Sequence, residues 1–399
     1  MPPAAGDAFR RVDALIGVGL ALARSAPSGQ VLLAQLALGI DPGWIPHPWG
    51  DELAAELEAA KRNAREPLSS KRIEQALRDA WGTPPTGELD DLDLEPVAVT
   101  PTSQVHRGVL DGAPVAVKVL RPGLATSVRQ DLALLDSLLA PLGAAFPALD
   151  ARAVLREVRE RVLDELDLEQ EASTQRRFHR ALRAHPWLTV PAPVMRLAHP
   201  GVLVSEWIDA VTLWDAPDPD QAAARLVRFA FGAATAGIMH SGLTPDDVLV
   251  LPDGGLAVLD CGAWCEVDRD RLSLFVVAFE AFLARDRNSF AAALEQLGWL
   301  PRSRGAASLE LIQQALGPLS EPGPARLDRA AVLAAGDRSR QHSDAIAPVL
   351  LAGALSPQDL WLARGVAQLF GTIARVGATG DWSGLIGEAL HDGWSAPLT

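Results

Sequence analysis

Lys118 carries the side chain whose chemistry most needs an explanation in this chain. It is one of three lysines in 399 residues, and it lies within the apolar run Pro114-Val-Ala-Val-Lys-Val-Leu120. A β-branched run that begins after Asp111-Gly112 and ends before Pro122-Gly123 is typical of a strand. An ammonium on such a strand must contact an anion or extend to water, because burying it unpaired is costly. The sequence therefore predicts an anionic partner or ligand for Lys118.

Two aspartates lie at the open end of a predicted β-hairpin. Residues 248–251 and 256–259 are strand-like, and Pro252-Asp-Gly-Gly255 between them is a typical turn. If the turn is centred between its second and third residues, Asp247 faces Asp260 with the Cβ atoms about 4.5–5.5 Å apart. Two such carboxylates repel each other unless a cation lies between them, and Mg²⁺ binds oxygen ligands of this kind together with phosphate oxygens. The alternative is a solvated hairpin mouth whose charges are screened.

A third group of acidic side chains lies on the stretch 156–172, which is expected to be helical. Most of its charges fit a solvated helix face with ion pairs between residues i and i+4. Glu165, Asp167 and Glu171 are candidates for a more specific role. A carboxylate on the helix that follows the Lys118 strand can pair with that ammonium and fix its position.

The elements that must position these groups come as strands first and helices later. Strands are predicted at 97–99, 104–110, 115–120 and 202–207. Helices are predicted at 126–139 and 151–182, and an acidic connector at 88–95. This order predicts an α+β fold in two lobes. We expect three parts, namely an N-terminal helical extension over 1–90, a lobe of strands and helices over 91–208, and a mostly helical lobe over 209–399 that contains the hairpin near 247–260.

Composition sets outer bounds on function. With 48% hydrophobic residues the chain can bury a large core, and its net charge of −14 argues against nucleic acid as a partner. The two cysteines, Cys261 and Cys265, form no disulfide framework, so a cytoplasmic protein is expected. The apolar run 14–23 is shorter than a membrane crossing requires, so no transmembrane segment is expected. Peripheral membrane contact stays open.

The strings that carry these residues resemble the UbiB/AarF family of atypical kinases, with the family's motifs in the same order over residues 90–290. The matching strings are Pro96-Val-Ala-Val-Thr-Pro-Thr-Ser-Gln-Val-His106, Val115-Ala-Val-Lys-Val-Leu-Arg-Pro-Gly123, Glu165-Leu-Asp with Glu171-Ala172, Val202-Leu-Val-Ser-Glu-Trp-Ile208, and His240 followed by Leu259-Asp-Cys-Gly262. The resemblance implies a bilobal protein-kinase-like fold that binds ATP or ADP with Mg²⁺.

The resemblance also implies a role for residues on the first lobe. Lys118 would contact the nucleotide phosphates and pair with Glu171. The segment 98–104, which ends in Ser103 and Gln104, falls where the family has an alanine-rich phosphate loop. Only one alanine remains there, and a proline within it removes a backbone N–H donor.

Further roles fall on the hinge and the second lobe. Glu206 and Ile208 would lie at the hinge, where backbone groups meet adenine. Asp260 matches the aspartate of the Asp-Phe-Gly motif, with Cys261 in place of phenylalanine, and would bind Mg²⁺. Asp247 replaces the family's metal-binding asparagine, a change that keeps an oxygen ligand and adds a charge.

Two departures from the family pattern bear on activity. In His240-Ser-Gly-Leu-Thr-Pro-Asp-Asp247, Gly242 stands at the position of the catalytic aspartate, and glycine can neither orient nor deprotonate an attacking group. The family's Lys-x-Gly-Gln signature, if it corresponds to Pro27-Ser-Gly-Gln30, has lost its lysine. In the family that lysine meets the Glu-x-Asp pair, which is Glu165 and Asp167 in this chain.

Three functions stay open at this point. The leading one is an ATP- or ADP-binding protein with impaired phosphotransfer that regulates or scaffolds a protein of lipid or isoprenoid-quinone metabolism. The second is an active ATPase or small-molecule phosphotransferase in which Asp246 or Asp247 supplies the missing base. The third is a structural pseudokinase that binds no nucleotide.

Overall fold

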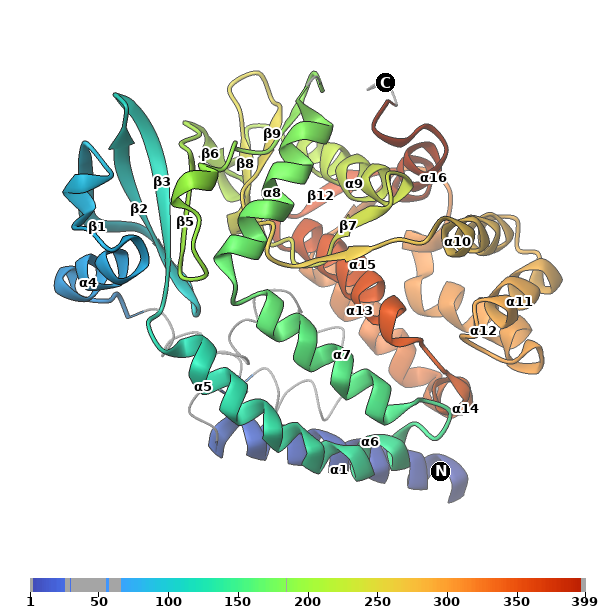
Figure 1. Ribbon diagram of the computed structural model, residues 1–399. Helices are drawn as coiled ribbons and strands as arrows, with labels where there is room; N and C mark the ends of the chain where they lie inside the picture. The colour runs from blue at the N-terminus through green and yellow to red at the C-terminus, as the bar shows by residue number, and fades with distance from the viewer. Residues whose placement is uncertain (1–2, 26–28, 30–54, 57–65, 184, 396–399) are drawn as a thin grey trace.

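The computed structural model describes residues 3–25, 29, 55–56, 66–183 and 185–395 (Figure 1). Among them the α-helices are α1 Pro3–Ser25, α4 Ser70–Trp81, α5 Leu124–Asp131, α6 Leu139–Ala145, α7 Ala151–Asp164, α8 Leu168–Leu182, α9 Pro219–Thr235, α10 Arg269–Leu283, α11 Arg287–Gln296, α12 Arg302–Leu316, α13 Arg329–Gln341, α14 Ser343–Ala352, α15 Pro357–Val376 and α16 Trp382–Asp392. The strands are β1 Asp91–Val99, β2 Ser103–Leu110, β3 Ala113–Leu120, β4 Leu188–Thr189, β5 Val202–Glu206, β6 Val211–Thr212, β7 Ile238–His240, β8 Val248–Val250, β9 Leu256–Val258, β10 Trp264–Glu266, β11 Ala325–Leu327 and β12 Ala378–Gly380. The predicted α+β fold in two lobes is confirmed.

The first lobe is built on an antiparallel sheet of order β1-β2-β3-β5. Side chains alternate between the two faces of a strand, and Val117 and Val119 of β3 pack with Ile73 and Leu77 of helix α4. Lys118 therefore lies on the opposite face, which is the face that α8 covers (Figure 1). The alternation along β3 decides which helix can provide a partner for the ammonium.

The first strand is longer than the sequence predicts. Residues 91–95 belong to β1, and Asp91 and Leu92 pair with Val109 and Gly108 of β2, so the acidic connector predicted over 88–95 is wrong for this part. The stretch alternates acidic and leucine residues, and Leu92 and Leu94 pack on the cluster of Ile73 and Leu77 while the acidic residues face outward. Period-two burial outweighs the poor strand propensity of aspartate here.

The charged stretch after the sheet is two helices instead of the single helix predicted over 151–182. Helix α7 ends at Asp164 and α8 begins at Leu168, so the chain breaks at Glu165-Leu166-Asp167. Upstream, the stretch predicted as a helix over 126–139 is α5, the 3₁₀ helix η3 Leu132–Leu138 and the start of α6. The break frees Glu165 from the helix register and gives Asp167 the N-cap position of α8.

The second lobe has helix α9 at its centre. Most residues of α9 are buried, and its apolar side chains pack with those of α15, α16 and the β8–β9 hairpin. A helix that is apolar on nearly all sides belongs in the interior of a domain. Two small sheets, β4-β9-β8-β6 and β10-β7, adjoin this core, and the segments next to their strands carry Thr244, Asp247 and Asp260 of the cavity described below.

The hairpin register differs from the predicted one by a single residue. Val248 pairs with Val258 and Val250 pairs with Leu256, so Asp247 lies opposite Leu259, whose amide donates to the Asp247 carbonyl at 2.9 Å. The prediction that Asp247 directly faces Asp260 is therefore wrong. The turn holds an odd number of residues, with Gly254 at a φ of 81°, instead of a symmetric two-residue turn.

The N-terminal extension is described only in part. Helix α1 lies against α6 and α14, at the bottom of Figure 1. The candidate signature Pro27-Ser-Gly-Gln30 falls outside the described residues except for Gly29. None of the helices described is both long and apolar enough to span a bilayer.

Candidate functional site

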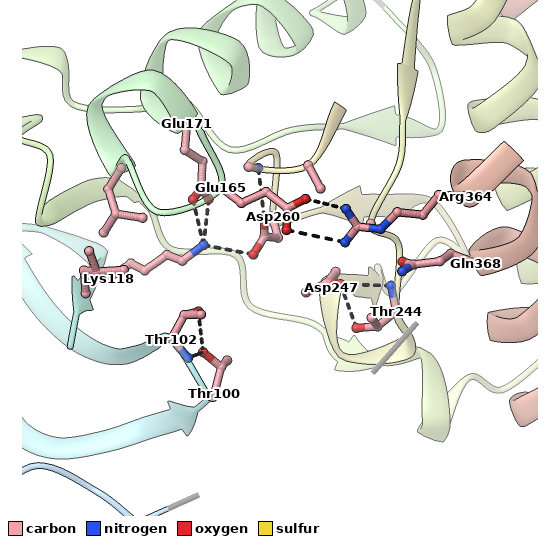
Figure 2. A pocket seen from close by; sticks show the side chains of 15 residues that line it. Thr100, Thr102, Lys118, Glu165, Glu171, Thr244, Asp247, Asp260, Arg364 and Gln368 are labelled. Carbon is pink, nitrogen blue, oxygen red and sulfur yellow. Dashed lines mark hydrogen bonds and ion pairs between the residues drawn. The ribbon is translucent and has the colours of Figure 1, made fainter. Parts of the chain in front are cut away.

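A cavity lies where strand β3 and helix α8 face the β8–β9 hairpin and helix α15 (Figure 2). It has a volume of about 620 Å³, including the space at its open mouth. Its lining residues are Thr100, Thr102, Lys118, Leu120, Glu165, Leu168, Glu171, Gly242, Thr244, Asp247, Asp260, Gly262, Ala263, Arg364 and Gln368. Four of these are carboxylates and two are cations, so the formal charge is −2 when all are ionised. A phosphate ligand is repelled by this charge unless a metal cation accompanies it.

Lys118 is held between two carboxylates. Its Nζ donates to both oxygens of Glu171 at 2.8 Å each and to Oδ2 of Asp260 at 2.9 Å (Figure 2). The Glu171 side chain is 2% exposed and that of Lys118 is 17% exposed. Glu171 is therefore the carboxylate of the charged stretch that pairs with Lys118, and Asp260 is a second partner that the sequence did not predict.

Local sequence explains how these groups meet. Asp167 Oδ1 accepts from the amides of Glu169 and Gln170 at 3.0 and 3.1 Å, which starts α8 and puts Glu171 in its first turn. A Cβ on Gly262 would lie 3.2 Å from Glu171 Oε2, so glycine leaves room for the carboxylate. Asp167 itself does not line the cavity, because its side chain caps the helix.

The network shifts the pKa values of its three members. Burial lowers the pKa of Lys118, but the charges of Asp260 and Glu171 outweigh it, so the net pKa lies above the ordinary value and the side chain stays charged. Burial raises the pKa of Asp260, but the charge and hydrogen bond of Lys118 outweigh it and bring the pKa to about 2. Burial and the Asp260 charge raise the pKa of Glu171 to about 7, although Lys118 opposes the shift. Asp260 is thus ionised at neutral pH.

Asp247 reaches the cavity from the capping box of the 3₁₀ helix Pro245–Asp247, which directly precedes β8. Its Oδ2 accepts from the amide and the hydroxyl of Thr244 at 2.9 and 2.6 Å, which leaves Oδ1 without a partner among the described residues. Burial and the nearby Asp260 charge raise the pKa of Asp247 to about 8, while the Thr244 hydrogen bonds lower it. Asp246, by contrast, is exposed and accepts from Trp214 Nε1 at 2.9 Å, outside the cavity lining.

The two aspartates supply an oxygen donor set of the kind that Mg²⁺ binds. Both line the cavity, and the raised pKa of Asp247 has the Asp260 charge as one of its causes. Within the part of the chain that the structure describes, no cluster of three or more metal-ligating side chains exists. Two carboxylates fit Mg²⁺, which usually keeps several waters and takes phosphate oxygens as further ligands.

Gly242 lines the cavity where the resemblance implies a catalytic aspartate. An added Cβ would lie 2.6 Å from the Cβ of Ala263, closer than real Cβ atoms approach. Gly242 does not have a positive φ, so the obstacle to a side chain is space and not backbone conformation. The segment is fixed by His240, whose Nε2 is hydrogen-bonded to the carbonyl of Asp260.

Arg364 and Gln368 of helix α15 are cavity residues that the sequence did not reveal. Arg364 forms an ion pair with Glu165 (Figure 2). Its guanidinium lies 4.7 Å from the ring centre of Trp361. Gln368 is 2% exposed. Glu165 is 199 residues away from Arg364, so no local pattern could pair them. The one sequence signal near these residues was Gly365, because a glycine within a helical pattern often marks a close packing contact. In the structure a Cβ at Gly365 would lie 2.8 Å from the carbonyl of His240.

Other predicted site residues lie outside the cavity lining. Ser103 and Gln104 are buried on β2, where Ser103 Oγ lies 3.0 Å from Thr100 Oγ1 and the Gln104 side chain accepts from the amide of Leu68. Their neighbours Thr100 and Thr102 provide the cavity wall instead. Glu206 pairs with Val115 across β3 and β5, and its carboxylate accepts from the amide of Ala192 at 2.9 Å. Glu206 and Ile208 do not line the cavity.

Comparison with known proteins agrees with this arrangement. A solved complex of Rv3197 from Mycobacterium tuberculosis with erythromycin has the same fold, with a TM-score of 0.63 and 23% identity over 92% of each chain. Proteins named "Probable protein kinase UbiB" are similar in sequence. The one from Aeromonas salmonicida is 27% identical over 68% of this chain and 53% of its own length, and the one from Cronobacter sakazakii is 27% identical over 64% and 50%.

The chain thus spans about half the length of these curated relatives. The family profile described as the ABC1 atypical kinase-like domain matches residues 61–294, which is more than half of the chain. Lys118, Glu171 and Asp260, which form the network at the centre of the cavity, all fall within the matched range. The chain belongs to the ABC1 family of UbiB-type atypical kinase-like proteins.

Proposed function

We propose that this protein binds ATP or ADP together with Mg²⁺ and is impaired in phosphotransfer. The observation that carries the proposal is the contrast within one cavity between the complete Lys118–Glu171–Asp260 network and the missing side chain at Gly242. The first part matches what a nucleotide phosphate chain requires, and the second removes the group that orients the attacking atom.

The charges of the cavity support metal-dependent binding. Asp260 and Asp247 would hold Mg²⁺, which when bound would neutralise charge on the phosphate oxygens. Lys118 would donate to phosphate oxygens while Glu171 keeps its ammonium in place. Thr100 and Thr102 also line the cavity; their amides donate within the turn, to the Ser103 carbonyl and to Thr100 Oγ1, so only their hydroxyl groups would be offered to the ligand.

Packing supports the loss of phosphotransfer. Because a Cβ at Gly242 would collide with Ala263, a single substitution cannot restore an aspartate without moving the neighbouring backbone. Two positions must change together, which is typical of a site whose structure has adapted to the absence of that side chain. We propose a regulatory or scaffolding role in lipid or isoprenoid-quinone metabolism, exerted in the cytoplasm on a protein of that metabolism.

Isothermal titration with Mg-ATP and Mg-ADP tests the binding. The wild-type protein should bind both nucleotides, and binding should vanish when Mg²⁺ is chelated. The Asp260→Asn variant should lose at least tenfold in affinity, because it removes the ionised metal ligand. A wild-type protein that binds neither nucleotide, or an Asp260→Asn variant with unchanged affinity, would contradict the proposal.

A second candidate function is slow ATP hydrolysis with Asp247 as the base. The raised pKa of Asp247, about 8, suits a general base near neutral pH, and its Oδ1 faces no other described partner. Asp246 is a poorer candidate, since it is engaged with Trp214 outside the cavity. ATP turnover by the wild type that Asp247→Asn abolishes would favour this function over the first.

A further inference from the structure

Helix α15 forms a wall of the cavity that lies across from Lys118. Arg364 and Gln368 are four residues apart, so their side chains extend from the same face of the helix. Figure 2 shows both directed into the cavity, with Asp247 and Asp260 between them and Lys118. The cavity therefore has a cation at each end, one on β3 and one on α15.

The α15 wall is rigidly fixed to the second lobe. Gly365 allows the helix backbone to approach the carbonyl of His240, where an added Cβ would lie 2.8 Å away. One turn beyond Gln368, Thr372 Oγ1 donates to the carbonyl of Leu243 at 2.9 Å. Both contacts are to the segment that carries Gly242, so the positions of Arg364 and Gln368 relative to the cavity floor are set by backbone contacts.

The polar groups of this wall have unused hydrogen-bonding capacity. Arg364 Nε and Gln368 Oε1 are buried and have no hydrogen-bond partner among the described residues. Gln368 is 2% exposed, and an amide this deeply buried is normally hydrogen-bonded. Arg364 is kept in place by Glu165 and by the face of Trp361, so its planar guanidinium is already oriented. Arg364 Nε is an unused donor and Gln368 Oε1 an unused acceptor, so the guanidinium would donate to a tetrahedral oxyanion directly, and the Gln368 amide would do so through its Nε2.

We propose that Arg364 and Gln368 form a subsite for the third phosphate of a nucleoside triphosphate, so that the cavity distinguishes ATP from ADP. In protein kinases the lysine of the third strand meets the α- and β-phosphates. A phosphate chain that starts at Lys118 and continues past the two aspartates reaches the α15 wall with its last phosphate. The nucleotide part of this inference rests on the proposed function, whereas the subsite itself requires only a chain of three phosphates.

The length of the phosphate chain provides the test. Titrations of the full chain use the Mg²⁺ complexes of tripolyphosphate, pyrophosphate, ATP and ADP. Arg364→Gln should weaken tripolyphosphate and ATP at least tenfold and change pyrophosphate and ADP less than twofold. Gln368→Leu changes no charge and removes an amide whose Oε1 has no hydrogen-bond partner among the described residues, and it should weaken only the three-phosphate ligands, about threefold.

The matched control is Arg375→Gln, which makes the same charge change on the same helix in its last turn, outside the cavity lining. It should leave all four affinities within twofold. Equal losses for two- and three-phosphate ligands in Arg364→Gln, or no loss in either variant, would overturn the subsite. If the wild type binds tripolyphosphate with this dependence but does not bind ATP, the subsite stands and the nucleotide function fails. If it binds neither, both fail.

Discussion

The two sides of the cavity differ in their contacts, since one is built from ion pairs and the other from close packing. On the β3 and α8 side, Lys118 is engaged at 2.8 Å by Glu171 and at 2.9 Å by Asp260. On the side formed by the segment after β7, Gly242 has no side chain. A Cβ added to Gly242 would lie 2.6 Å from the Cβ of Ala263, so Ala263 fills the space that a side chain would need. One side holds a lysine and two carboxylates in a connected network, and on the other side the space for a side chain is filled by Ala263.

The difference separates the contacts that the proposed ligand binding would use from those that phosphotransfer would require. The charged side is stabilised by its own ion pairs, since a buried lysine without Glu171 and Asp260 would be costly. The packing at Gly242 does not affect the ion pairs of Lys118, because Gly242 has no side chain that could hydrogen-bond to them. A protein can therefore keep the first while losing the second, and each side can be tested alone.

Breaking the charged side should have the largest effect. Lys118→Met leaves Glu171 and Asp260 without their cation, which should lower the free energy of unfolding by about 3–5 kcal/mol and abolish nucleotide binding. At a ligand concentration of about 100 times Kd, the wild type should gain about 2.7 kcal/mol from Mg-ATP, and the variant should gain nothing. Urea unfolding with and without Mg-ATP measures both quantities.

A double variant separates stability from binding. Lys118→Met with Glu171→Gln also removes the unpaired buried carboxylate, so it should recover part of the lost free energy of unfolding and still fail to bind. A double variant that regains Mg-ATP binding would show that Lys118 supports the fold and not the ligand.

Opening the packed side should have an intermediate effect. Gly242→Asp should lower the free energy of unfolding by about 1–3 kcal/mol, because its Cβ meets Ala263. Adding Ala263→Gly should restore most of that stability and give measurable Mg-dependent ATP hydrolysis, since a carboxylate then has room to orient the attacking group.

Ala263→Gly alone serves as the control and should hydrolyse no more ATP than the wild type. A Gly242→Asp single variant as stable as the wild type would show that packing against Ala263 does not exclude a side chain at this position. Hydrolysis in Ala263→Gly alone would mean that the missing aspartate is not what limits phosphotransfer.

The pH dependence of metal binding should be the smallest effect. Because the pKa of Asp247 is raised to about 8, this carboxyl is mostly protonated at pH 7, and a bound Mg²⁺ must displace its proton. Affinity for Mg²⁺ should rise about tenfold from pH 6 to pH 7 and level off above pH 8. Titration calorimetry with Mg²⁺ alone measures this, and Asp247→Asn should flatten the profile. A flat wild-type profile would remove Asp247 from the metal site.

The sequence predicted the charged side better than the packed side, for a physical reason. A lysine among valines has few stable environments, so its strand, its need for an anion and the candidate Glu171 follow from local pattern. The register of the β8–β9 hairpin depended on whether the turn held two or three residues, and Pro252-Asp-Gly-Gly255 suits both. The predicted facing of Asp247 and Asp260 was wrong for that reason, although both side chains reach the cavity.

The packed side and the α15 wall depend on contacts between distant segments. Ala263 closes the space at Gly242, and Arg364 of the second lobe pairs with Glu165, which is 199 residues away in the sequence. The break at Glu165-Leu166-Asp167 that frees Glu165 lies inside a stretch whose composition favours a continuous helix. Tertiary contacts outweigh local propensity at each of these places.

The nucleotide retained by the protein tests the central claim most directly. The wild type is saturated with Mg-ATP, incubated for several hours, and separated from free nucleotide before the bound nucleotide is quantified. We predict that intact ATP is recovered in a one-to-one ratio with the protein. Recovery of ADP in its place would contradict the impaired phosphotransfer, and recovery of no nucleotide would contradict the binding.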